Sequence, residues 1–133
     1  MIMHKKLLLI KNIVIFSLFF GLSTMHSKEV WIVVHGTFAN KVAKAIPSVG
    51  WWKPGSPFFK ELKASAGKDA VVYPFGWSGA NSDQQRKKAS QELTDFIEAV
   101  TTSKDTLFIV GHSHGANVAI LCSQELVRRK SNL

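Results

Sequence analysis

One short stretch near the end of the chain places the strongest constraint on its fold. Thr106–Val110 is an apolar run, residues 111–115 read Gly-His-Ser-His-Gly, and Ala116–Leu121 is rich in small residues with helical character. This order predicts a strand that turns sharply into a helix, with Ser113 at the turn. Such a turn imposes unfavourable backbone angles on the serine and brings the strand close to the helix. Glycine on either side is therefore what steric limits require. An ordinary strand–glycine–helix turn is the alternative interpretation of the pentapeptide.

The first 27 residues have the pattern of an export segment. Lys5 and Lys6 precede a largely apolar run from Leu7 to Leu22, and small residues follow. This predicts a secretory signal peptide. An uncleaved N-terminal membrane anchor is the alternative, although the uninterrupted apolar part (13–22) is short for a membrane span. In both cases we expect residues 28–133 to lie outside the cytoplasm, either periplasmic or secreted.

The charge of the chain excludes some partners. The formal net charge is +8, and it falls to +5 without residues 1–27, which hold three lysines and no acid. A modest positive excess suits loose attraction to anionic surfaces, including membranes. Nucleic-acid binding is not expected because no basic stripe with interleaved aromatic residues occurs, and Arg86–Lys88 falls on the polar face of a predicted helix. Cys122 is the single cysteine, so we expect a buried thiol with no intrachain disulfide, and no Cys-rich zinc site.

Apolar runs and helical patterns alternate along the chain. Glu29–Val34, Asp69–Tyr73 and Thr106–Val110 are predicted strands. Between them, helices are predicted over residues 41–46, from Ser56-Pro57 through Ala66, and from a capping box at Ser82 and Gln85 onwards, and the last helix is expected to reach about Arg128. The alternation predicts an α/β fold in which three parallel strands, doubly wound, are flanked by helices. One domain at most is expected over residues 28–133, and it lacks the later strands that would complete such a sheet.

Ser113 is the candidate nucleophile of this chain. A serine hydroxyl needs an adjacent general base, which is itself oriented by a third group. The negative oxygen of a tetrahedral intermediate needs backbone N–H donors, one of them from the residue after the nucleophile, here His114. The second donor is expected from the loop after the first strand, with the Thr37 amide favoured and Phe38 as the neighbouring alternative. A plain strand–loop turn is the other interpretation of residues 35–38.

Together, Val33–Phe38 (Val-Val-His-Gly-Thr-Phe) and Val110–Gly115 resemble the bacterial lipase/esterase branch of the α/β-hydrolase superfamily. The Trp51–Pro57 and Tyr73–Gly79 segments are similar to that group as well. The resemblance covers about residues 30–128, the first part of such a domain. It implies a partial α/β-hydrolase fold that hydrolyses a carboxylic ester of a lipid or another apolar acyl group, without a cofactor or a metal.

The chain departs from the family pattern after the serine. The family order is nucleophile, then acid, then histidine. After Ser113 the chain contains Glu125, within the predicted helix, and His114, which directly follows the serine. Neither is expected to serve in a triad, because neighbours on a sharp turn splay away and the helix leads away from the site. We therefore expect a truncated chain that is inactive and poorly folded by itself. The alternative is a non-catalytic envelope protein that keeps this half of the fold as a binding or interaction module.

Aromatic residues in two loops are candidates for the substrate pocket. Trp77 and Phe75 follow the second predicted strand, at the sheet edge where ligands of α/β folds bind. Four aromatic residues between the first two predicted strands are expected either to line an acyl pocket or form part of a lid, or to cover the sheet edge: Trp51, Trp52, Phe58 and Phe59.

Overall fold

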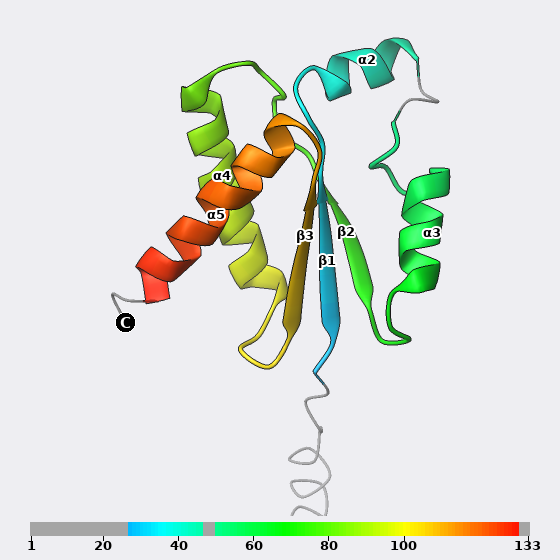
Figure 1. The fold of residues 1–133 in the computed structure, drawn as a ribbon, viewed down its shortest axis with the longest axis vertical. Helices are drawn as coiled ribbons and strands as arrows, with labels where there is room; N and C mark the ends of the chain where they lie inside the picture. The colour runs from blue at the N-terminus through cyan, green and yellow to red at the C-terminus, as the bar shows by residue number, and fades with distance from the viewer. Residues whose placement is uncertain (1–26, 47–49, 131–133) are drawn as a thin grey trace, which may run out of the picture.

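The structure is a computed structural model that describes residues 27–46 and 50–130 (Figure 1). The predicted export segment lies outside these ranges except for its last residue. Strands and helices alternate as follows: β1 (Glu29–Val34), α2 (Ala39–Ala45), α3 (Pro57–Ser65), β2 (Val71–Phe75), α4 (Asp83–Val100), β3 (Thr106–Gly111) and α5 (His114–Lys130). The predicted α/β class with three strands and flanking helices is confirmed.

The three strands form one parallel sheet in the order β2-β1-β3. The central strand β1 is apolar throughout its inner part, and its residues Val30, Ile32, Val33 and Val34 have no exposed surface. This agrees with an unbroken apolar run that is covered on both faces. β3 lies at one side of the sheet, and its outer edge is unpaired among the described residues.

Helices cover both faces of the sheet unequally. α4 and α5 lie together on one face, α3 covers the opposite face beside β2, and α2 sits beyond the carboxyl ends of the strands (Figure 1). The main core lies between the sheet and the α4–α5 layer. Buried residues of β1, β2, α4 and α5 meet there: Val30, Ile32, Val34, Phe75, Ala89, Leu93, Ile97, Val118 and Cys122. The sequence predicts one apolar face of α4 from residues that recur at helical spacing, and all of them lie in or against this core: Ala89, Leu93, Phe96, Ile97 and Val100.

Cys122 is fully buried, as predicted, and its sulfur accepts a hydrogen bond from Thr94 Oγ1 at 3.3 Å. Burial raises the pKa of this thiol, so the neutral form is favoured. Several charged residues of the α4–α5 layer form ion pairs at its surface. Arg129 Nη1 lies 2.8 Å from Asp95 and 2.7 Å from Glu98, and Lys88 lies 3.7 Å from Glu92. Lys87 and Lys88 are exposed, in agreement with the predicted polar helix face, whereas the Arg86 side chain is only 13% exposed and pairs with Asp83.

The helix starts and the second strand differ locally from the prediction. Ser56 caps α3 as expected, and its Oγ accepts from the Phe59 amide at 3.1 Å. The capping box of α4 does not form, because Gln85 accepts a hydrogen bond from Ser78 instead. β2 begins later than predicted and continues through Pro74. A proline is tolerated there because β2 is an edge strand.

Candidate active site

Ser113 lies at the turn between β3 and α5, at the carboxyl end of the sheet. Its φ angle is 53°, in the left-handed region that residues other than glycine rarely adopt. The two flanking glycines lie where neighbouring backbone segments come too close to leave room for a Cβ atom. A Cβ on Gly115 would be 2.5 Å from the carbonyl oxygens of Val34 and His35, and one on Gly111 would be 2.7 Å from the Ala116 backbone. The sharp strand-to-helix turn predicted from the sequence is therefore present, and it presents an exposed serine.

The loop after β1 lies directly against this turn. A Cβ on Gly36 would be 3.0 Å from Ser113 Cβ and from His112 Nδ1, so only glycine lets the two loops meet. Thr37 Oγ1 and His114 Nδ1 share a hydrogen bond that ties the loop to the start of α5. The sequence motifs predicted that residues 35–38 and 111–115 lie together, and the structure places them side by side.

Two backbone amides at this junction are free to donate. Among the described residues, no hydrogen-bond partner accepts from the amides of Thr37 and His114. The Phe38 amide, in contrast, donates to the Gly79 carbonyl at 2.8 Å. The geometry therefore favours Thr37 over Phe38 as the donor paired with His114. Phe38 has a φ of 60°, and it and Ser113 are the two non-glycine residues with positive φ in residues 27–46 and 50–130.

A cavity of about 220 Å³ opens beside Ser113, and we call it the serine pocket. It is lined by Gly36, Thr37, Ala39, Val42, Trp51, Trp52, His112 and Ser113. Trp52 is 3% exposed; it lines the cavity and also belongs to the core cluster on that side of the sheet. Trp51, like Trp52, was among the aromatic residues expected either to line a pocket or to cover the sheet edge, and it lies on the wall. Ala39 and Val42 were not predicted there, and their position just after the 35–38 loop was the available signal.

Trp77 and Phe75 do not line the serine pocket, which corrects the prediction. Both are buried in the core between the sheet and α4, with exposed fractions of 4% and 9%. The Trp77 indole donates to the His35 carbonyl at 2.8 Å, and the Phe75 ring lies 6.1 Å from the Phe96 ring. Large aromatic and small residues alternate over residues 75–78, and the aromatic ones are the buried ones, so this period of two was the signal for a core position.

His35 is a buried structural histidine. Its Nε2 accepts from the Trp77 amide at 3.3 Å, so the proton resides on Nδ1, which donates to the Gly36 carbonyl at 2.8 Å. Burial lowers the pKa of this imidazole, and the positive charge of Lys53 lowers it further. A neutral His35 therefore shapes the loop that carries Thr37.

No general base contacts Ser113 within residues 27–46 and 50–130. Its hydroxyl has no hydrogen bond to an imidazole or a carboxylate there. His114 is engaged with Thr37, and His112 lies on the pocket wall, with its ring 5.5 Å from the Trp51 ring. Glu125 binds Arg128 at 2.6 Å and Arg129 at 3.0 Å, and these hydrogen bonds lower the pKa of its carboxyl to about 2.

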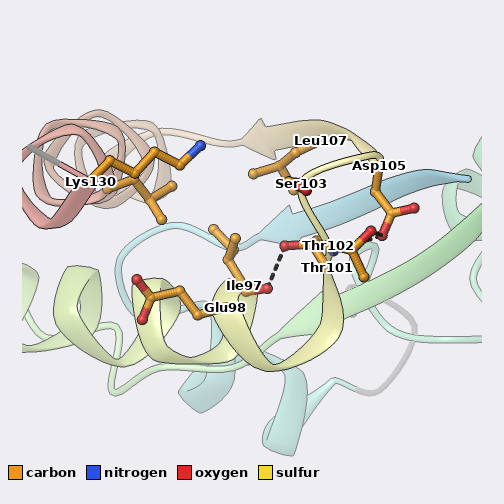
Figure 2. Close-up of a pocket in the computed structure, with 9 residues that line it drawn as sticks. Ile97, Glu98, Thr101, Thr102, Ser103, Asp105, Leu107 and Lys130 are labelled. Atoms are coloured by element: carbon orange, nitrogen blue, oxygen red, sulfur yellow. Dashed lines mark hydrogen bonds between the residues drawn. The ribbon is translucent and has the colours of Figure 1, made fainter. Parts of the chain in front are cut away.

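A second cavity lies at the opposite end of the sheet (Figure 2). It measures about 290 Å³ and is bounded by the end of α4, the start of β3 and the end of α5. Two of its polar groups are engaged within the fold: Thr101 Oγ1 donates to the Ile97 carbonyl at 2.7 Å, and Asp105 accepts from the Thr102 amide at 2.8 Å. No group of three or more potential metal ligands gathers in the part of the chain that the structure describes.

Comparisons of the chain with protein-family models, with curated proteins and with solved structures found no match. Within the two described ranges, no helix has the length and apolarity needed to cross a bilayer.

Proposed function

We propose that this chain belongs to an exported serine hydrolase of the lipase or carboxylesterase type, with Ser113 as the nucleophile. One observation carries the proposal: an exposed serine at φ 53° stands beside two unoccupied amides, those of Thr37 and His114. Strained residues and free backbone donors are costly, and they concentrate at sites that use them. The resemblance of Val33–Phe38 and Val110–Gly115 to α/β-hydrolases leads to the same reaction.

In the proposed reaction, Ser113 Oγ attacks the carbonyl carbon of an ester. The carbonyl oxygen becomes negative and accepts hydrogen bonds from the Thr37 and His114 amides. The alcohol leaves with a proton, and water then releases the acid from the acyl-serine. The apolar walls formed by Trp51, Trp52 and Val42 suit an acyl group. The cavity is smaller than the roughly 300–1,000 Å³ of drug-sized sites, which favours a short acyl group or the first part of a longer one.

The proton of Ser113 needs an acceptor that residues 27–46 and 50–130 do not place beside it. We therefore expect negligible ester turnover by this chain in the absence of an added base. Free imidazole supplied in solution can replace a missing histidine, so it should increase acylation of Ser113.

Reaction with a fluorophosphonate probe tests the proposal. The phosphonyl group should attach to Ser113, its rate should rise with imidazole, and peptide mass spectrometry should locate it there. Ser113→Ala should abolish the adduct. Ser123→Ala is the matched control, since Ser123 is an exposed serine on α5 whose hydroxyl donates to the Ile120 carbonyl at 2.7 Å. Labelling that is spread over several serines, or that survives Ser113→Ala, would overturn the proposal.

A non-catalytic binding module is the second candidate, and the lack of a base beside Ser113 among the described residues favours it. This alternative requires a cooperative fold and ligand binding that is indifferent to Ser113→Ala. A thermal melt of the full chain followed by circular dichroism tests this alternative first, because a broad, non-cooperative melt excludes a folded module.

A further inference from the structure

A basic hollow lies across α2 from the serine pocket. Ala39 and Val42 of this helix line the serine pocket, whereas Asn40, Lys41 and Lys44 line a separate cavity of about 360 Å³. The loop after α2 divides in the same way. Trp52 belongs to the serine pocket and Lys53 to the second cavity, which we call the lysine pocket (Asn40, Lys41, Lys44, Lys53 and Ser78). The two cavities therefore share a wall.

The lysine pocket carries uncompensated positive charge. Three of its five lining residues are lysines and none is acidic. Within residues 27–46 and 50–130, no ion pair joins Lys41, Lys44 or Lys53 to a carboxylate. The ion pairs in these ranges lie instead on α4 and α5. Three cations that converge on one hollow repel one another, and an anion between them would relieve this repulsion.

Aromatic rings hold two of the ammonium groups near the shared wall. Lys53 Nζ lies 5.7 Å from the centre of the Trp52 ring, and Lys41 Nζ lies 5.7 Å from the centre of the Phe38 ring. Trp52 is buried and packs against His35 at 4.7 Å between ring centres. The cations are thus placed by groups that belong to the serine pocket and to the loop that carries Thr37.

We propose that the lysine pocket binds an anionic group, a phosphate or a carboxylate, of the same ester whose acyl group enters the serine pocket. The inference rests on the proposed function and names its substrate class: an anionic acyl ester such as an acylated glycerol phosphate. The two cavities share α2 and the Trp52-Lys53 segment as a wall, so the acyl group and the anionic group of one molecule can occupy neighbouring cavities. Lysine ammonium groups bind phosphate and carboxylate oxygens as point charges, and three of them line this cavity.

Binding to the full chain tests this proposal separately from catalysis. Calorimetric titration at low ionic strength would compare a short-chain acylated glycerol phosphate, the matched neutral acyl glycerol and inorganic phosphate. We expect the phosphate-bearing ester to bind most tightly. The variant Lys41→Gln/Lys44→Gln/Lys53→Gln should weaken its binding at least about tenfold, while affinity for the neutral ester stays unchanged.

The matched control is Lys60→Gln/Lys63→Gln/Lys68→Gln, which removes the same charge from three exposed lysines outside the lysine pocket. Equal weakening by both triple variants would overturn the proposal, because it would show attraction by net charge alone. Inorganic phosphate that binds as tightly as the ester would also overturn it, since the anion site would then act without the acyl group. Both readouts are affinities, so a failure of Ser113 to react with the fluorophosphonate would not affect them.

Discussion

The two ends of the parallel sheet differ in how completely their polar groups are used. At the amino end, Asp105 accepts hydrogen bonds from the Lys28 amide at 3.0 Å and the Thr102 amide at 2.8 Å. Glu29 accepts from the Trp31 indole at 3.0 Å and the Gly67 amide at 3.2 Å. At the carboxyl end, the Ser113 hydroxyl and the Thr37 and His114 amides have no such partners among the described residues. Cavity size does not reveal this difference, because the cavity at the amino end is larger than the serine pocket.

This difference indicates which end of the sheet keeps features that cost stability and are expected to serve function. Acids at the amino end close turns, and the hydrogen bonds that they accept lower the pKa of Glu29 and of Asp105. At the carboxyl end the fold keeps positive φ angles, close glycine contacts and a cluster of lysines, each of which costs stability. The rigid core around β1 compensates for these costs, so the carboxyl end is the expected place for function.

The largest effect on stability is expected at the closest backbone contact of the carboxyl end, which is at Gly115. Gly115→Ala would place a Cβ 2.5 Å from the Val34 and His35 carbonyl oxygens, which are backbone atoms of the central strand and the loop after it. The strand and helix must separate, so we expect a loss of about 3 kcal/mol in the free energy of unfolding, measured by urea denaturation. Gly76→Ala is the control, because a Cβ at Gly76 would meet nothing within 4 Å. Equal stabilities of the two variants would show that the close approach at Gly115 is not rigid.

The pH dependence of the free energy of unfolding should distinguish the two ends of the sheet. The pKa of His35 is lowered by burial, so the unfolded chain binds a proton on this residue more readily than the folded chain. Its contribution is complete above the ordinary pKa of about 6.5 and is lost as the pH falls from there towards the folded value. The slope for one group cannot exceed about 1.4 kcal/mol per pH unit. The contributions of Glu29 and Asp105 to stability also decrease as the pH falls, but only below about 4.5.

The measurement is the urea midpoint between pH 7 and pH 5. His35→Asn retains a donor for the Gly36 carbonyl but cannot titrate, so the slope in this window should decrease. His112→Asn, at an exposed position on the serine-pocket wall, is the control. A slope that is unchanged in His35→Asn would assign the pH dependence to other groups.

Much of this fold could be predicted because local patterns and tertiary packing agree. Glu29–Val34 was predicted with the bounds that the structure has, since an unbroken β-branched run suits only a strand covered on both faces. The Ser56 cap and the buried face of α4 followed from local rules in the same way. The predicted end of β2 at Tyr73 was wrong, because Pro74 was expected to end the strand. The sequence does not tell whether a strand lies at the edge of its sheet, where a proline is tolerated.

The site was predictable where one glycine-rich turn determines the backbone, and less so elsewhere. Ser113 and the 35–38 loop were paired from their motifs, but the pairing of Phe38 with Gly79 depends on a loop contact between distant segments. Trp77 was assigned to the pocket because it follows a strand, whereas its hydrogen bond to His35 holds it in the core. The lysine pocket had no signal at all, since Lys44 and Lys53 meet only through the packing of α2 and the following loop.

The smallest effect concerns the strain at Ser113 itself. Ser113→Ala and Ser113→Gly both remove the hydroxyl, but only glycine adopts a φ of 53° without steric cost. A left-handed residue costs roughly 1–2 kcal/mol, and the greater freedom of glycine in the unfolded chain offsets part of this gain. We therefore expect Ser113→Gly to be more stable than Ser113→Ala by about 1 kcal/mol in urea denaturation. Equal stabilities would mean that the turn relaxes when the serine is replaced. A gain for glycine would show that the fold holds Ser113 in a strained conformation, as a preorganised nucleophile requires.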